Sequence, residues 1–170
     1  MKRNGYTFRT VMTILSVAFV CFIWGNSLVP GKESGALSLS IRDFVNNILR
    51  NIGINAEVTN YMVRKAAHFT EHMFFGACLL VTLRSYTKDI IRYLSNILFI
   101  GLLVPVIDEF IQLFIDGRGG EIKDVIIDFS GILTGIIIAS IIVRLVDRNR
   151  MRNKNKERKI VGARYKNYKR

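Results

Sequence analysis

The feature that most limits what this chain can fold into is a set of long apolar runs without a formal charge. Residues 11–29, 93–107 and 129–143 contain no Asp, Glu, Lys or Arg. A helix that crosses a bilayer needs about 20 predominantly apolar residues. When a few flanking polar residues are included, the sequence predicts membrane-spanning helices at about residues 10–29, 64–83, 93–115 and 124–146. The predicted fold class is all-α, a polytopic bundle of four transmembrane helices.

These four helices leave no room for a separate soluble domain in a chain of 170 residues. Residues 1–146 are predicted to form one membrane domain, and residues 147–170 a basic tail. Because the tail is polar and basic, we expect it to be disordered and drawn to anionic lipid of the inner leaflet. It offers no folded module and no row of aromatic rings on which bases could stack, so nucleic-acid binding is not predicted. No A-x-A-like cleavage site follows Trp24, so the first helix is expected to stay in the protein.

The distribution of basic residues predicts the orientation of the chain. Eighteen of the 25 Lys and Arg residues lie in segments 1–9, 84–92 and 144–170. The other seven lie between residues 32 and 65 or at 118 and 123. Cytoplasmic loops carry the Lys and Arg excess. Both termini are therefore predicted to be cytoplasmic in the cell membrane, with residues 30–63 and 116–123 on the outer side.

The outer segment between the first two spans has a pattern of its own. Residues 31–37 are typical of a turn, and Ser40 with Asp43 matches a capping box at the start of a helix. Apolar residues then recur at helical spacing through residue 52, with Gly53 as the expected stop. We expect an amphipathic helix over residues 40–52 in the outer interface. Whether it is a plain interfacial helix or a lid stays open.

Polar residues in and beside the spans gather on the predicted outer side. Each Asp at the centre of a membrane helix costs about 2.5–3.5 kcal/mol on insertion scales, and such residues usually face the protein interior. No acidic residue or histidine lies in the predicted cytoplasmic half of any span. The sequence therefore predicts one polar pocket, open to the outside, built from Asn26, Lys65, His68, Glu71, His72, Asp108, Glu109, Gln112, Arg118, Asp124 and Asp128.

These residue types are suited to acid–base chemistry and to anion binding. His68 and Glu71 lie one helical turn apart and can act as an acid–base pair. With Asp108 and Glu109, they are the candidate catalytic residues. Lys65 and Arg118 are suited to a phosphate or carboxylate. The candidate ligand-binding residues are Asn26, Lys65, Gln112, Arg118, Asp124 and Asp128.

A metal site and a purely structural network are the alternatives for the same residues. His68 to His72 match the H-x-x-E-H pattern of inverted zincins, which would need a third ligand from Asp108, Glu109 or Asp128. The match covers only five residues, so we assign no metal and no cofactor. A network of ion pairs that holds the helices in register would use the same side chains. A transporter is disfavoured because no polar residues line the inner half of the bundle.

The combined pattern resembles the VanZ-like membrane proteins over about residues 10–146. The resemblance rests on Lys65-x-x-His68-Phe69-x-Glu71, Asp108-Glu109-x-x-Gln112, Arg118, Asp124, Gly131-x-x-x-Gly135, and Asn26-Ser27 with the Ser-containing outer loop. It implies about four spans and, through the namesake of the family, a link to resistance against the glycopeptide teicoplanin. The sequence departs from the family pattern at two positions. The family commonly has an aromatic residue where His72 stands and Asn where Asp128 stands.

Three functions are consistent with these observations. The first is an outward pocket that binds or modifies a cell-envelope component and lowers glycopeptide susceptibility. The second is a membrane-embedded hydrolase or transferase that acts on a lipid-linked envelope substrate. The third is a structural or partner-binding membrane protein. The expected partners are membrane lipids or a lipid-linked envelope precursor, and a glycopeptide. Whether the protein is an enzyme stays open.

Overall fold

The computed structural model describes residues 2–168, which form α-helices and one 3-10 helix and contain no strand. The elements are α1 (Lys2–Ser27), α2 (Gly31–Asn51), α3 (Asn60–Tyr86), η1 (Ile91–Tyr93), α4 (Leu94–Gln112) and α5 (Ile122–Tyr168). Four stretches are long and apolar enough to cross a membrane: Gly5–Ser27, Asn60–Tyr86, Ile91–Gln112 and Ile122–Arg158. They confirm the four predicted spans and the all-helical fold.

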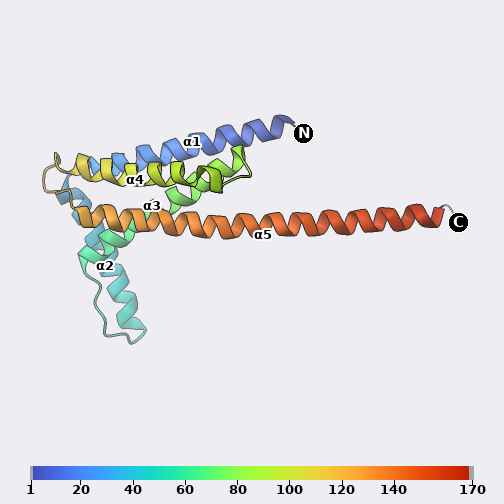
Figure 1. Cartoon of the computed structure of the whole chain (residues 1–170). Helices are drawn as coiled ribbons and strands as arrows, with labels where there is room; N and C mark the ends of the chain where they lie inside the picture. Colours follow the sequence, from blue (N-terminus) through green and yellow to red (C-terminus); the bar gives the residue numbers. More distant parts are fainter. Residues whose placement is uncertain (1, 169–170) are drawn as a thin grey trace.

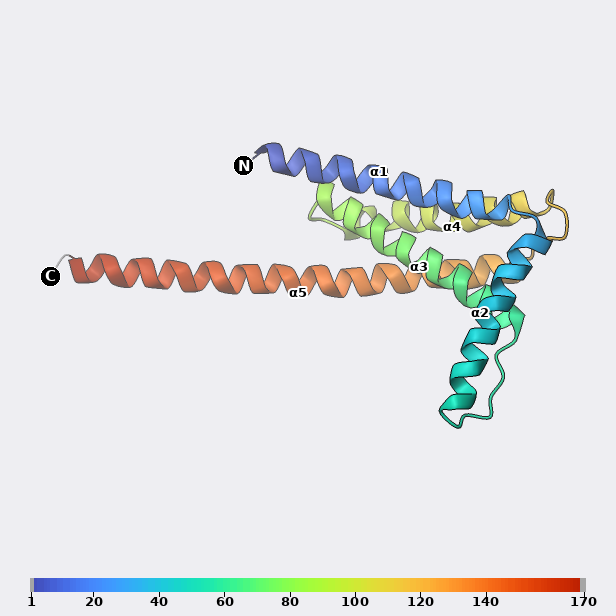
Figure 2. The same ribbon diagram turned by 180° about the vertical axis from the view of Figure 1, so that it is seen from behind.

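The four long helices run side by side, and both chain ends lie at the same end of the bundle (Figures 1 and 2). We call this end, which also holds residues 87–90, the terminal end. The opposite end holds α2 and residues 113–121, and we call it the α2 end. Helix α3 is central because it packs against α1, α2, α4 and α5. Helix α4 also packs against α1 and α5.

The outside of the bundle is apolar, whereas several buried side chains are polar. Large hydrophobic side chains are exposed along the spans, among them Ile14, Val17, Phe99, Ile137 and Ile141. The buried interior contains His72, Asp108, Glu109, Gln112 and Asp128. Such a distribution suits a protein whose outer surface contacts lipid and whose ionisable residues face inward. The chain is therefore described as a multi-pass membrane protein.

Two glycines let α5 approach the backbone of α3. A Cβ atom at Gly131 would lie 2.4 Å from the carbonyl oxygen of Phe69, and one at Gly135 would lie 1.9 Å from that of Met73. Both distances are shorter than any side chain tolerates, so only glycine permits this helix spacing. The Gly131-x-x-x-Gly135 pattern is thus used for packing inside the bundle.

Helix α2 begins earlier than the sequence predicted. Residues 31–37 are helical and form no turn, because the helix begins directly after Pro30. The carbonyl oxygen of Pro30 accepts from the N–H groups of Glu33 and Ser34, and the N–H of Gly31 donates to the backbone carbonyl of Asp116 in the turn between α4 and α5. Ser40 is therefore inside the helix, where its hydroxyl donates to the Ala36 carbonyl, and the predicted capping box is wrong.

The end of α2 agrees with the sequence prediction. Gly53 has a φ of 79°, in the left-handed region that glycine adopts without strain. The N–H of Gly53 donates to the Arg50 carbonyl, and the N–H of Ile54 donates to the Leu49 carbonyl. These two bonds form a Schellman motif, which satisfies carbonyl groups that the last turn of a helix leaves free. The expected stop at Gly53 is confirmed.

The basic tail differs from the expectation of disorder. Helix α5 continues without a break from the fourth span through Tyr168 (Figure 1). No Gly or Pro interrupts the sequence between Gly135 and Gly162, and Arg, Lys, Met and Glu are good helix formers. The charged composition indicated solvent exposure correctly, but it did not exclude a helix. Residues 169–170 of the tail lie outside the described residues.

Candidate functional site

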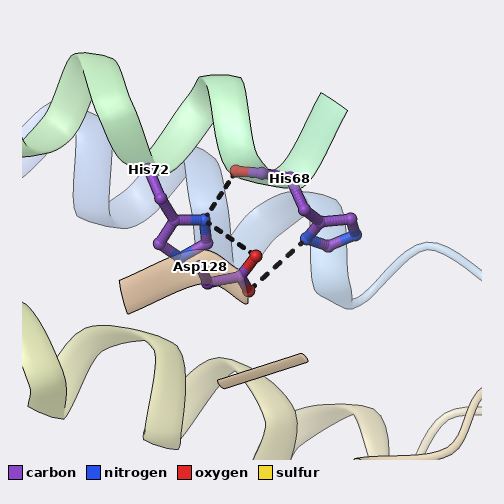
Figure 3. A group of neighbouring side chains, drawn as sticks. All are labelled: His68, His72 and Asp128. Carbon is purple, nitrogen blue, oxygen red and sulfur yellow. Dashed lines mark hydrogen bonds and ion pairs between the residues drawn. The ribbon is translucent and has the colours of Figure 1, made fainter. Parts of the chain in front are cut away.

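The contact between α3 and α5 at the α2 end is lined by ionisable side chains. Lys65 forms an ion pair with Asp124, and both side chains are largely buried. One turn deeper, His68 and His72 lie against Asp128 (Figure 3). Because α3 and α5 run in the same direction, successive turns of one helix meet successive turns of the other. The glycine contacts described above fix this register.

The two histidines and Asp128 form a compact buried group. The Nδ1 atom of His68 lies 3.8 Å from Oδ2 of Asp128, and the Nδ1 atom of His72 lies 3.6 Å from Oδ1. Both distances exceed the usual length of a hydrogen bond. The imidazole rings are stacked with centroids 6.4 Å apart. Neither carboxylate oxygen of Asp128 has a hydrogen-bond partner among the described residues, although the side chain is only 1% exposed.

The protonation of His72 follows from its backbone contact. Its Nδ1 atom lies 2.9 Å from the carbonyl oxygen of His68. A carbonyl oxygen accepts but does not donate, so Nδ1 must carry the proton in this contact. The other ring nitrogen, Nε2, is buried and has no partner among the described residues. A lone pair on Nε2 is therefore left without a donor.

A second group of buried polar side chains joins α1, α4 and the turn before α5. The hydroxyl of Ser27 donates to Oδ1 of Asp108 at 2.6 Å. The Gln112 amide donates to Oδ2 of Asp108 at 3.2 Å and to Oε1 of Glu109 at 3.0 Å. The backbone N–H of Glu121 donates to Oε2 of Glu109 at 3.0 Å. These bonds supply the partners that buried carboxylates need.

Arg118 ties the α4–α5 turn to the end of α1. Its Nε atom donates to the Val29 carbonyl at 2.7 Å, and its Nη2 atom donates to the Asn26 carbonyl at 3.0 Å. Burial lowers the pKa of the Arg118 guanidinium from its usual value. Arginine nevertheless stays protonated in proteins, because its ordinary pKa lies far above neutrality. Arg118 thus supplies a fixed positive charge at the α2 end.

A cavity of about 240 Å³ opens between α1, α2 and α3 beside Arg118. Its polar lining includes Asn26, His68, Glu71 and Arg118, and the Asn26 amide donates to Oε1 of Glu71 at 3.1 Å. Its complete set of lining residues is Asn26, Val29, Glu33, Ser34, Leu37, Ser38, Ile41, Val63, Arg64, Ala67, His68, Glu71 and Arg118. The lining combines charged groups with aliphatic side chains, so the cavity is amphiphilic.

The structure divides the predicted site residues into two sets. Four of them line the cavity: Asn26, His68, Glu71 and Arg118. The others lie in the helix contacts behind it: Lys65, Asp108, Glu109, Gln112, Asp124 and Asp128. The single pocket that the sequence predicted is therefore replaced by a cavity between α1, α2 and α3 and by two buried polar groups. The expected His68–Glu71 pair is not formed, because Glu71 accepts from Asn26 and His68 faces Asp128.

Sequence reasoning missed the contribution of α2 to the cavity. Glu33, Ser34, Ser38 and Arg64 line it but were not among the candidate residues. Glu33 and Ser34 belong to the segment that was predicted to be a turn, and Ser38 lies between that turn and the helix expected over residues 40–52, so all three were given no helix face. Pro30 followed by Glu33 is a start signal for a helix, since an acidic residue in the first turn complements the helix dipole. That signal would have placed them correctly.

Comparison with known proteins identifies the family of the chain. A model of the VanZ/LLP1 family matches residues 10–143, which is most of the chain. The chain belongs to the VanZ/LLP1 family. No curated protein and no solved structure matched the chain in the corresponding searches. The predicted resemblance to VanZ-like proteins is confirmed.

The two positions at which departures from the VanZ-like pattern were expected are neighbours in space. His72 stands on α3 and Asp128 on α5, far apart in the sequence, yet their side chains are neighbours (Figure 3). The polar groups of the family pattern are also gathered at one end of the bundle, as the sequence predicted. The α2 end is therefore where a function of this VanZ/LLP1 protein is to be sought.

Proposed function

We propose that the cavity at the α2 end binds the polar part of a cell-envelope component, such as the headgroup of a membrane lipid or lipid-linked precursor. The observation that carries the proposal is the amphiphilic lining. Arg64 and Arg118 offer positive charge, and Glu71 offers an acceptor. Leu37 and Ile41 of α2 add an apolar wall. An amphiphile presents the same combination of a charged group beside hydrocarbon.

The size of the cavity favours a small polar group over a whole antibiotic. Pockets that enclose drug-sized ligands measure about 300–1,000 Å³. The cavity measures about 240 Å³, which suits a headgroup and not a complete glycopeptide. We therefore infer that this VanZ/LLP1 protein lowers glycopeptide susceptibility, including that to teicoplanin, by acting on an envelope component and not by enclosing the antibiotic.

Arg64 is the most direct anchor for an anionic group. It lines the cavity and takes part in none of the hydrogen bonds or ion pairs found among the described side chains. Arg118, by contrast, already donates to two backbone carbonyls. A guanidinium group binds phosphate or carboxylate through two parallel hydrogen bonds. The ligand is therefore expected to be anionic and to contact Arg64 first.

Tolerance assays with matched charge changes test the proposal. Arg64→Gln and Glu71→Gln alter the cavity, whereas Arg50→Gln and Glu57→Gln make the same changes outside it. We expect the cavity variants to lose teicoplanin tolerance and to retain less envelope lipid after purification, measured by native mass spectrometry. The control variants should behave as the wild type does. If both cavity variants accumulate normally, protect fully and retain the same lipid, the proposal is wrong.

A hydrolase or transferase activity is the second candidate, because His68 and Glu71 line the same cavity. A carboxylate and an imidazole one turn apart can move protons on a bound group. This function requires turnover of a lipid-linked substrate in reconstituted vesicles. Glu71→Gln, which keeps the hydrogen bond from Asn26, should then abolish product formation while the substrate still binds. Joint loss of binding and turnover would contradict a separate catalytic role.

A further inference from the structure

The charge balance around Asp128 points to a missing cation. Asp108 and Glu109 lie close to Asp128, with one oxygen from each carboxylate within 4.8 Å of the others. All three side chains are buried. Among the described residues no Lys or Arg forms an ion pair with any of them, because Lys65 pairs with Asp124 and Arg118 donates to backbone carbonyls. A buried carboxylate is strongly unfavourable unless it takes up a proton, is paired with a cation or binds a metal.

Hydrogen bonds supply partners for two of the three buried carboxylates. Asp108 accepts from Ser27 and Gln112, and Glu109 accepts from Gln112 and the N–H of Glu121. Asp128 accepts from no described residue through either oxygen. The unmet requirement is therefore confined to Asp128, which faces His68 and His72 as well as the two other carboxylates.

The donor set around Asp128 is that of a transition-metal site. One nitrogen from each imidazole and one oxygen of Asp128 lie within 4.8 Å of one another. Ligating histidines usually donate their second ring N–H to a backbone carbonyl or carboxylate, which fixes the ring. His72 makes such a contact with the carbonyl of His68. Two imidazoles and a carboxylate suit Zn²⁺, whereas Mg²⁺ and Ca²⁺ take mainly oxygen ligands.

We propose that His68, His72 and Asp128 bind one Zn²⁺ ion that links α3 to α5 beside the cavity. The ion supplies the positive charge that the carboxylates lack and gives partners to the bare nitrogen of His72 and to Asp128. His68 lines the cavity and its side chain is 22% exposed, so the cavity gives the ion a path to the site. Three protein ligands leave the fourth position of a tetrahedral Zn²⁺ site open, as in catalytic zinc sites. The proposal does not depend on what the cavity binds.

Metal content of the purified protein tests the site directly. The chain has only two histidines, His68 and His72. If the affinity tag contains no histidine, any imidazole ligand that is detected must come from one of them. After bound metal has been removed with a chelator and the protein reloaded with ZnCl₂, we expect elemental mass spectrometry to find one Zn²⁺ per chain. Zinc-edge X-ray absorption should show two imidazole nitrogens and oxygen. A protein that retains no zinc after reloading, or a spectrum without imidazole ligands, would overturn the proposal.

Matched variants separate this site from adventitious zinc. Asp128→Asn and His72→Gln should each weaken Zn²⁺ binding at least about tenfold in titration calorimetry. Asp43→Asn makes the same change at an exposed carboxylate of α2, outside the site, and should leave the affinity unchanged. Equal weakening by all three, or Mg²⁺ binding as tightly as Zn²⁺, would contradict the proposal. If a variant does not fold, the wild-type protein loaded with Co²⁺ provides a second test. Visible absorption typical of a tetrahedral Co²⁺ site would support the proposal, and the absence of this absorption would reject it.

Discussion

Gly135 of α5 rests on the carbonyl group of Met73 in α3, so closely that an added Cβ atom would lie 1.9 Å from the carbonyl oxygen. The nearest atom is backbone, which cannot swing away as a side chain does. This contact and that of Gly131 with Phe69 bring α3 and α5 together beside His72 and Asp128. The group formed by His68, His72 and Asp128 therefore depends on a helix spacing that glycine contacts permit, those of Gly131 and Gly135 among them.

A methyl group at Gly135 is expected to separate the two helices. Gly135→Ala should destabilise the protein by about 1–3 kcal/mol, the usual cost of overpacking, measured by thermal unfolding in detergent. Gly25→Ala serves as the control because an added Cβ at Gly25 meets nothing within 4 Å. If both variants unfold at the wild-type temperature, the close contact between α3 and α5 is not required for stability.

Removal of the Ser27 hydroxyl should lower the unfolding free energy, because this hydroxyl joins α1 to Asp108 of α4. Ser27→Ala leaves Oδ1 of Asp108 without its 2.6 Å donor in a fully buried position. An unsatisfied buried acceptor costs about 1–3 kcal/mol, more when it is charged. Ser40→Ala, whose hydroxyl only bonds within its own exposed helix, should change the unfolding free energy little. Equal stability of both variants would show that the bond to Asp108 contributes nothing.

Much of this architecture could be predicted from the sequence because the membrane imposes it. The charge-free runs located three of the four spans, and the expense of ionisable residues in lipid placed the polar side chains together at one end. Gly53 was recognised as a helix stop because its role is local. These predictions needed only periodicity and composition, and the structure confirms them.

The partners of the polar residues could not be predicted, because they depend on helix rotation and register. Glu71 was expected to pair with His68 on its own helix, yet it accepts from Asn26 of α1. The N–H of Gly31 donates to the backbone carbonyl of Asp116, more than 80 residues along the chain, a contact that no local pattern indicates. The register of α3 against α5 is fixed by backbone contacts at Gly131 and Gly135, which hydrophobic patterns do not reveal.

The ion pair between Lys65 and Asp124 should show strong energetic coupling. The side chains are 21% and 14% exposed, so each charge loses much of its hydration and needs the other. In a double-mutant cycle with Lys65→Met and Asp124→Asn, we expect a coupling above about 1 kcal/mol, because breaking a buried pair strands one charge. The more exposed Arg42–Asp43 pair provides the comparison and should give less than about 1 kcal/mol. Equal coupling of the two pairs would refute this difference.

Cysteine labelling tests the predicted orientation. In a background with Cys21→Ala and Cys78→Ala, single cysteines at Glu57 and Asn153 report opposite ends of the bundle. The excess of Lys and Arg at the terminal end predicts that it is cytoplasmic. A membrane-impermeant maleimide should therefore label Glu57→Cys in intact cells and Asn153→Cys only after permeabilisation. The reverse pattern would place the α2 end inside the cell.

The terminal end should hold anionic lipid. A cavity there, of about 710 Å³, is lined by Arg84, Lys88, Arg150 and Lys154 together with aliphatic residues of α3 and α5. Asp147 neutralises Arg84 through a 2.6 Å ion pair, which leaves the other three cations for a headgroup. Basic residues near a membrane surface each add about fivefold to the affinity for anionic lipid. Lys88→Gln and Lys154→Gln should therefore reduce the phosphatidylglycerol retained in native mass spectrometry several-fold each, whereas Lys32→Gln at the α2 end should not. Equal retention by all three variants would show that this cavity does not select anionic lipid.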